Sequence, residues 1–383
     1  MTPATVLYVH SSSEHYGADR QLAVIAGGLD RNRFTPLVVV PEPGPLVDDL
    51  RAAEVEVLIR PLGVIRRGFA TPSGAAAIGA GVARDALALR RLIKQRDVKL
   101  VHSNTSVVLG GAAAAKAARI PHVWHVREIY AAYGRAWTVH RRVLQAGASA
   151  LPCVSAATTE QFGGVGAAGG RVSVLHDALA VARARAPRAA ARAALGLPEK
   201  APVVALLARL TEWKGQDVLI RALAEPELRE RQAVAVLAGA VWPGQEAREV
   251  KIIELARSLG VEDRVVRIGF REDVENVYGA ADVIAVPSTL PDPLPGAAIE
   301  AAAAGCAVIA ANHGGLPEII KDHTTGLLVA PGDARALARA AAELIDDPAL
   351  RERLGAAASA DIAERFSVEA LLSDVQSLYE RLL

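Results

Sequence analysis

Cysteine is scarce in this chain, which has only Cys153 and Cys306 among its 383 residues. Each lies inside an apolar, strand-like run, and their spacing fits neither a metal site nor a disulfide framework. We therefore expect two small, buried hydrophobic side chains in a protein of a reducing compartment. No Asp-x-Asp motif occurs either, and we expect neither a metal nor a cofactor.

Long apolar runs are also absent. Glu300 interrupts the longest Ala-rich run, so no segment approaches the roughly eighteen apolar residues of a transmembrane helix. The opening residues, MTPATVLYVH, lead directly into a strand without the basic and apolar regions of a signal peptide. We expect a cytoplasmic protein whose contact with a membrane is at most peripheral.

Two common nucleotide-binding motifs are missing where they would be expected, because no G-x-G-x-x-G follows the first predicted strand of either half and the chain contains no Walker A run. What it does contain is a regular alternation of amphipathic helices, such as 75–95 and 105–118, with continuous apolar runs typical of buried parallel strands. The predicted strands are Val6–His10, Pro36–Val40, Val55–Ile59, Leu100–Ser103, His122–Val126, Leu151–Val154 and Val172–Leu175, followed by Val203–Ala208, Ala233–Ala238, Val265–Gly269, Val283–Val286, Ala307–Ala310 and Leu327–Val329.

The alternation falls into two blocks, and 383 residues exceed what one hydrophobic core normally serves. We therefore expect an α/β protein of two Rossmann-like domains whose parallel sheets face each other across a cleft. The predicted boundaries are 1–178 and 179–365, with a linker and entry helix within 178–200. Residues 366–383 have helical spacing of apolar positions and form a separate C-terminal helix.

The stretch from Ala285 to Glu318 is the most informative part of the sequence. Asp292 and Glu300 lie eight positions apart, on either side of a turn in which Pro295-Gly296 begins a helix to about residue 304. The free amides and positive dipole end of such a helix suit a phosphate, while flanking carboxylates suit hydroxyl groups. This combination favours a sugar nucleotide as the ligand.

The whole stretch resembles the signature of the family 4 glycosyltransferases. The matching residues are Pro287-Ser288, Asp292-Pro293, Gly296, Glu300, Gly305, Gly314-Gly315 and Glu318. The resemblance implies that the segment Leu294, Pro295, Gly296 and Ala297 binds the donor, that Asp292 binds a sugar hydroxyl and that Glu300 binds the ribose. The family usually has glutamate at the first acid, so Asp292 is one methylene shorter.

A second match follows the first strand of the second block. Arg209 and Lys214 occupy an R-x-x-x-x-K-G run, and in the family both cations contact the donor diphosphate. Two cations five positions apart, at the carboxyl end of a parallel strand, can stabilise a departing diphosphate. Phe270, after Gly269, matches the Gly-Phe element that holds the nucleotide base. Glu318 is a candidate partner for Arg209 or Lys214.

The first block matches more loosely. Gly17 stands where the family has a Gly-rich loop beside the donor phosphate and acceptor, although the usual second glycine is Tyr16 here. His125 matches a strand-end histidine that faces the donor sugar, and Arg127 is a candidate for supporting contacts or an acceptor phosphate. His176-Asp177 replaces the usual Asn-Gly before the hinge, and no contact is assigned there.

The formal net charge is only +1, so no global field selects nucleic acid. Basic residues nevertheless gather in the first half. Solvated helix faces explain most of them, and a surface for anionic lipid heads or a phosphate-bearing acceptor is the alternative. These residues are Arg66-Arg67, Arg84, Arg90-Arg91, Lys94, Arg96, Arg135 and Arg141-Arg142.

The resemblance implies a retaining, metal-independent transferase of GT-B architecture that moves a sugar from a nucleotide-diphosphate sugar to a carbohydrate, lipid-linked or small-metabolite hydroxyl. It also implies that residues 1–178 bind the acceptor, that 179–365 bind the nucleotide sugar and that the helix 366–383 crosses back to the N-terminal domain. Its catalytic groups would be His125, Arg209, Lys214 and Asp292, and polysaccharide or lipid-linked glycan synthesis is slightly favoured. Alternatives are a sugar-nucleotide epimerase, a glycogen-type phosphorylase and a non-catalytic sugar-nucleotide-binding partner. The sugar, the base and the acceptor stay open.

Overall fold

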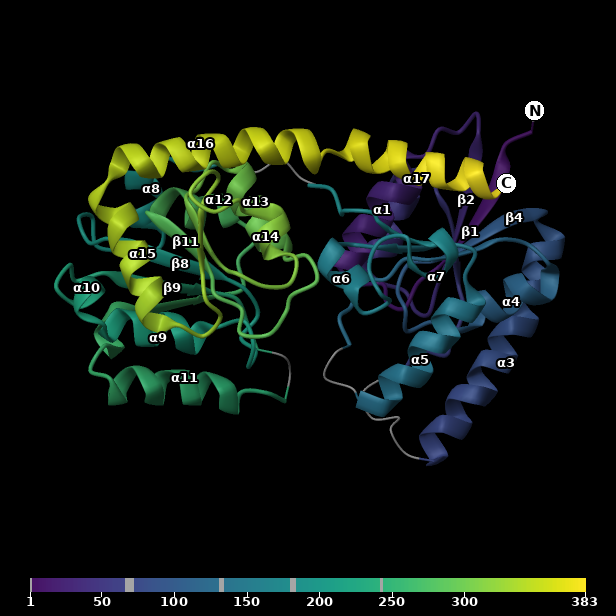
Figure 1. Ribbon diagram of the computed structural model, residues 1–383, viewed down its shortest axis with the longest axis horizontal. Helices are drawn as coiled ribbons and strands as arrows, with labels where there is room; N and C mark the ends of the chain where they lie inside the picture. Colours follow the sequence, from purple (N-terminus) through teal and green to yellow (C-terminus); the bar gives the residue numbers. More distant parts are fainter. Residues whose placement is uncertain (1, 66–71, 131–133, 180–183, 242–243) are drawn as a thin grey trace. The chain divides into compact units, whose positions relative to one another are not determined.

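The computed structural model describes residues 2–65, 72–130, 134–179, 184–241 and 244–383, without the side chains of 72–76 and 135. The chain divides into two compact units. The first comprises 1–180 together with 368–383, and the second comprises 181–367 (Figure 1). Each unit contains a parallel sheet covered by helices on both faces, the arrangement that β-α alternation predicts.

The sheet of the first unit has the order β3-β2-β1-β4-β5, and every described pair is parallel. A two-stranded parallel pair, β6-β7, continues from β5 through isolated bridges such as Val126 to Cys153. The strands are β1 (Ala4–Val9), β2 (Phe34–Val40), β3 (Glu56–Ile59), β4 (Val98–Ser103), β5 (His122–Trp124), β6 (Leu151–Cys153) and β7 (Val172–Val174).

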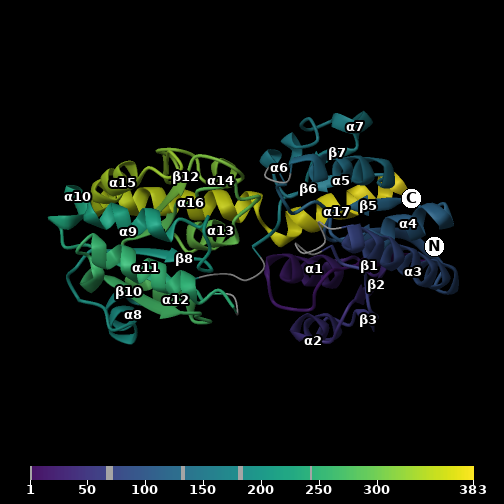
Figure 2. The ribbon, with the colours of Figure 1, turned by 90° about the horizontal axis from the view of Figure 1, so that it is seen from below.

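Successive side chains of β1 point to opposite faces, and each face has its own core. Tyr8 packs with α1 (Gly17–Gly28), α2 (Pro45–Ala52) and α17 (Val368–Leu382). Val9 packs with α3 (Pro72–Gln95) and α4 (Gly110–Ala118), which lie side by side in Figures 1 and 2. The remaining helices are α5 (Gly134–Gly147), α6 (Ala156–Glu160) and α7 (Ala167–Gly170).

The C-terminal helix α17 is tied to the first unit by buried polar contacts. The Tyr379 hydroxyl lies 2.9 Å from the Tyr8 hydroxyl and 2.6 Å from His102 Nδ1. The Gln376 side chain accepts a hydrogen bond of 2.8 Å from the Asp30 amide. Burial raises the pKa of both tyrosines, so these phenols stay protonated and can donate.

The sheet of the second unit has the order β10-β9-β8-β11-β12-β13, again parallel. Its strands are β8 (Val203–Leu207), β9 (Val234–Ala238), β10 (Val265–Gly269), β11 (Val283–Val286), β12 (Val308–Ala311) and β13 (Leu327–Val329). One face is covered by α9 (Gln216–Ala224), α11 (Ala247–Ser258) and α15 (Ala334–Asp346), and the other by α8 (Arg188–Ala194), α12 (Val274–Ala280) and α13 (Gly296–Ala303) (Figure 1). Shorter or peripheral helices are α10 (Pro226–Arg229), η3 (Glu262–Arg264), α14 (Leu316–Ile319) and α16 (Pro348–Arg365).

All thirteen predicted strands are present, with ends that shift by two residues or fewer. Both cysteines are buried and free, as predicted, and burial raises the pKa of each thiol to about 12. The start of the helix predicted at Thr105 is wrong, because α4 begins at Gly110. Val108 forms an antiparallel bridge with Val64, and this long-range pairing holds the preceding residues out of the helix.

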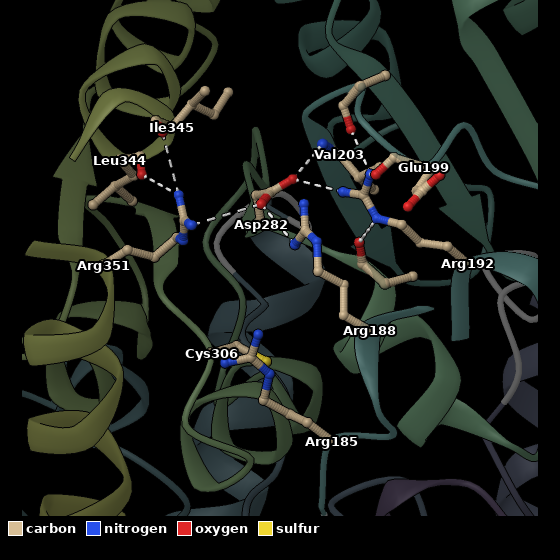
Figure 3. Close-up of polar contacts among 12 residues, drawn as sticks. Arg185, Arg188, Arg192, Glu199, Val203, Asp282, Cys306, Leu344, Ile345 and Arg351 are labelled. Carbon is tan, nitrogen blue, oxygen red and sulfur yellow. Dashed lines mark hydrogen bonds and ion pairs between the residues drawn. The ribbon is translucent and has the colours of Figure 1, made fainter. Parts of the chain in front are cut away.

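Asp282, just before β11, forms ion pairs with three arginines at the amino end of the second sheet (Figure 3). Its carboxylate lies 2.8 Å from Arg188 Nη1, 2.9 Å from Arg192 Nη2 and 3.8 Å from Arg351 Nη2. It also accepts a 2.8 Å hydrogen bond from the Val203 amide. Arg192 is buried and also donates to four backbone carbonyl groups, so this carboxylate joins α8, β8, β11 and α16.

We predict that Asp282→Ala destabilises the protein severely. Removing one partner of a buried ion pair leaves Arg192 uncompensated, at a cost of about 3–5 kcal/mol. Asp346→Ala is the matched control, because its pair with Arg231 is exposed and such pairs contribute about 0–1 kcal/mol. Urea unfolding of both variants would measure the difference, and equal losses would contradict the structural role of Asp282.

Candidate functional site

The predicted donor-binding loops of the second unit are neighbours because their strands are neighbours. β8, β11 and β12 lie next to one another in a parallel sheet, so the loops that follow them leave the same edge. These loops comprise residues 208–215, 287–295 and 312–315.

Hydrogen bonds connect the three loops. The Thr289 amide donates to the Trp213 carbonyl at 2.7 Å, which ties the loop after β8 to the loop after β11. The Gly315 amide donates to the Asp292 carbonyl at 2.8 Å, and His313 Nε2 lies 2.7 Å from the Ser288 carbonyl. Hydrogen bonds therefore join all three loops at this edge of the sheet.

Two glycines allow the backbones to approach this closely. Gly215 has φ of 78°, and a Cβ there would lie 2.0 Å from the Pro287 carbonyl oxygen. Gly314 has φ of 59°, and its Cβ would lie 2.4 Å from the Asp292 carbonyl oxygen. Only glycine fits either position, which gives a packing reason for both glycine motifs.

Lys214 and Asp292, predicted to bind different parts of a donor, contact each other. Lys214 Nζ lies 2.5 Å from Asp292 Oδ2 and 4.2 Å from the centre of the Trp213 ring. The Asp292 side chain is 7% exposed, whereas that of Lys214 is 21% exposed. Lys214 is thus the more accessible member of the pair. Its pairing with Asp292 was not predicted from the sequence.

The start of α13 lies in the same loop group. Pro295 is the N-cap residue and supplies no side-chain cap, and the first turn closes with a 3.0 Å hydrogen bond from the Ala298 amide to the Pro295 carbonyl. The amides of Gly296 and Ala297 precede this bond, and a Cβ on Gly296 would meet no atom within 4 Å. The helix start is therefore open at the position where an anion would bind.

The other predicted donor residues occupy the same edge of the sheet or its continuation. Arg209 is exposed in the loop after β8, and its carbonyl accepts a 2.9 Å bond from Gln216 Nε2. Glu300 is half-buried one turn inside α13, which follows Leu294 and Pro295. Phe270 follows β10 and is 69% exposed, so its ring is accessible to a ligand.

Sequence reasoning missed three buried oxygens in or beside these loops. Thr211 Oγ1, Gln216 Oε1 and Ser288 Oγ have no hydrogen-bond partner among the described residues. Because buried polar groups are nearly always paired, these atoms indicate a polar site that a ligand or water completes. The only sequence signal was Ser288 in the family's Pro-Ser pair.

In the first unit, the loop after β1 is organised by His10 and Asp19. His10 Nε2 lies 2.6 Å from Asp19 Oδ1, and the other Asp19 oxygen accepts from the Tyr16 amide at 2.8 Å. These contacts fix the start of α1, where Gly17 has open space beside its Cα. Gly17 therefore presents an unobstructed backbone, as a residue that approaches a ligand must.

His125 lies just beyond β5 and is buried. Burial, together with the nearby Arg127 guanidinium, lowers the pKa of His125 well below its usual range, so the imidazole is neutral. Its Nε2 atom has no partner within the described part of the chain, and neither has Nε2 of His102. The two rings are 5.6 Å apart, so β4 and β5 end in two neighbouring imidazoles with unsatisfied nitrogens.

Arg127 occupies a structural position. Its side chain is 6% exposed and forms an ion pair with Asp177, while Nε donates to the Asn104 carbonyl at 3.1 Å. Asp177 belongs to the His176-Asp177 element that departs from the family pattern, and its carboxylate neutralises the Arg127 guanidinium. In this arrangement the guanidinium already has partners, which disfavours direct contact with a substrate.

Two known protein families match this chain. The family described as "Glycosyltransferase Family 4" matches residues 16–183, and the one described as "Glycosyl transferases group 1" matches 187–361. HepE of Anabaena, solved with UDP, has a TM-score of 0.82 and 26% identity over 99% of this chain and 100% of that chain. Its UDP-glucose complex has a TM-score of 0.80 at the same identity and coverage.

The chain spans about half the length of the curated relatives it matches. The D-inositol 3-phosphate glycosyltransferase of Streptomyces avermitilis is 39% identical over 221 residues, covering 55% of this chain and 47% of the relative. That of Kribbella flavida is 42% identical over 178 residues, or 45% and 42%. WaaG, a glycosyltransferase involved in lipopolysaccharide biosynthesis, shares the fold with a TM-score of 0.65 at 17% identity, covering 98% of this chain and 99% of that chain.

The two parallel sheets and the shared architecture define a GT-B fold, as predicted. The two family matches together span most of the chain, and the chain belongs to the family 4 glycosyltransferases. No helix within the described residues is both long and apolar enough to cross a membrane.

We predict that Gly215→Ala destabilises the second unit more than Gly332→Ala. Both glycines have φ near 77°, so each substitution carries the left-handed cost of about 1–2 kcal/mol. Only at Gly215 would the new Cβ overlap a carbonyl group, which adds roughly 1–3 kcal/mol of overpacking. Chemical denaturation of both variants tests this, and similar midpoints would argue against the close approach.

Proposed function

We propose that the protein transfers a glycosyl group from a UDP-activated hexose to an acceptor hydroxyl, with retention at the anomeric carbon. The observation that carries the proposal is the group formed by Lys214, Arg209 and the open start of α13 on adjacent loops. Support for UDP and glucose comes from HepE, which matches this chain over nearly its full length and was solved with UDP-glucose.

The diphosphate would be held by positive groups of the second unit. Arg209 and Lys214 supply two cations, and the amides of Gly296 and Ala297 supply hydrogen bonds at the positive end of α13. These groups would stabilise the charge that develops on the leaving diphosphate, a role that a divalent metal performs in other transferases. The proposal therefore includes catalysis without a metal.

The rest of the donor would meet polar and aromatic groups on the same edge. Glu300 would accept hydrogen bonds from the ribose hydroxyls, and Phe270 would form a wall for the base. In the first unit, the family resemblance supports a backbone contact of Gly17 with the donor phosphates and a bond from Nε2 of neutral His125 to a sugar hydroxyl. The buried oxygens of Ser288 and Gln216 are further candidates for donor or water contacts.

Transfer would occur on one face of the sugar. The bond between C1 and the phosphate oxygen breaks, the acceptor oxygen bonds C1 from the same side, and its proton passes to the leaving phosphate. The Asp292 carboxylate contacts Lys214, and this pairing with the ammonium makes it a poor nucleophile. This arrangement supports direct transfer over a covalent glycosyl-enzyme intermediate.

The acceptor is proposed as a cell-surface polysaccharide or lipid-linked glycan. The exposed basic side chains of α3 and α5 support an anionic acceptor or membrane surface, and Asp85, the acid within α3, is buried. Two of these basic residues have acidic partners: Arg84 pairs with Asp85, and Arg96, just after α3, pairs with Glu56. Arg66 and Arg67 lie outside the described residues, as does the side chain of Arg135. The exposed set on these two helices is Arg84, Arg90, Arg91, Lys94 and Arg142.

We predict that UDP-sugars raise the melting temperature of the protein more than GDP- or dTDP-sugars at equal concentration. A ligand that binds only the folded state stabilises it by RT ln(1 + [ligand]/Kd), so the ligand that binds more tightly gives the larger shift at equal concentration. Lys214→Ala should remove most of this shift and reduce turnover by at least about tenfold, which corresponds to ~1.4 kcal/mol.

Lys251→Ala is the control for this experiment, because Lys251 is an exposed lysine of the same unit on α11. Equal activity of the two lysine variants would rule out a diphosphate contact for Lys214. Consumption of the donor without any acceptor would instead favour an epimerase, and binding without transfer to any acceptor would favour a non-catalytic partner.

We also predict that turnover is unchanged by EDTA. The positive groups in the site are side chains and amides, so chelation removes none of them. Initial rates with and without excess EDTA, followed by addition of Mg²⁺ or Mn²⁺, measure the effect. A loss of activity that either ion restores would show that the protein groups do not suffice.

A further inference from the structure

The loop backbone holds Asp292 in place independently of any ligand. The Asp292 carbonyl accepts from the Gly315 amide at 2.8 Å, and Gly314 lies against the Asp292 backbone so closely that a Cβ would clash with both its oxygen and its nitrogen. The residue is 5% exposed. Its carboxylate can therefore move little, and it faces the loop after β8.

The Asp292 carboxylate directs Lys214. Lysine has a long side chain that loses about 2 kcal/mol of rotamer entropy when it is fixed. Asp292 Oδ2 at 2.5 Å and the Trp213 ring at 4.2 Å fix the ammonium before any ligand arrives. An ammonium has three N–H donors, and one bond to Asp292 leaves others for a phosphate oxygen.

We propose that Asp292 is the positioning residue for Lys214 and does not bind a sugar hydroxyl. Aspartate is one methylene shorter than the glutamate usual at this position, and its Oδ2 atom already contacts the lysine. Asp292 then contributes to binding of the nucleoside diphosphate even when no sugar is attached. This inference rests on the proposed function, because it assigns Lys214 to the diphosphate.

The discriminating measurement is the affinity for UDP compared with that for UDP-glucose. We expect Asp292→Asn, which keeps the shape and removes the charge, to weaken binding of both ligands by the same factor. Directly contacting residues couple strongly in double-mutant cycles, so this factor should be about fivefold or more. In a Lys214→Ala background the same substitution should change UDP affinity less than about twofold.

Asp292→Glu is a second variant, in case Asp292→Asn does not fold. It keeps the charge and displaces the ammonium, so UDP and UDP-glucose should again lose affinity in equal proportion. Asp346→Asn is the matched control, because it removes an exposed carboxylate paired with Arg231 in the same unit. It should leave both affinities unchanged.

Isothermal titration of each variant with each ligand separates the outcomes. Unchanged UDP affinity with weakened UDP-glucose binding would assign Asp292 to the sugar and overturn the inference. Tighter UDP binding in Asp292→Asn would show that the carboxylate competes for Lys214, which also overturns it. A parent protein that binds none of UDP, GDP and dTDP would refute the proposed function, and this inference with it.

Discussion

The close backbone contact between Gly215 and Pro287 is the constraint on which the candidate site depends. It brings the loop after β8 against the loop after β11, so that Lys214 and Asp292 come within hydrogen-bond distance. The equivalent contact of Gly314 with Asp292 adds the loop after β12. Without these two close backbone contacts, the loops would still leave the same edge of the sheet, but the side chains of Lys214 and Asp292 would not meet.

The fold could be predicted almost completely from the sequence, because the strands are continuous β-branched runs with a strong local signal. The start of α4 could not, since the pairing of Val108 with Val64 joins residues 44 positions apart. The same limitation applies to the three arginines around Asp282, which come from α8 and α16. Long-range pairings leave no periodic trace in a sequence.

The residues of the candidate site were predicted by motif, and their mutual contacts were not. Motif spacing placed Lys214 and Asp292 in neighbouring loops, yet their ion pair depends on two glycine contacts that spacing does not reveal. Arg127 is the converse case, because its type suggested a phosphate contact whereas Asp177, fifty positions away, occupies it. Side-chain type indicates which chemistry is available, and partner geometry decides whether it is free for a ligand.

The two ends of β11 show how one strand serves stability and function separately. At the amino end, arginines and a backbone amide contact the Asp282 carboxylate, so this buried charge is compensated. At the carboxyl end, Ser288 keeps a buried hydroxyl without a partner among the described residues, which costs about 1–3 kcal/mol. The paired end thus contributes to the stability of the unit, whereas the unpaired hydroxyl at the other end is available to a ligand.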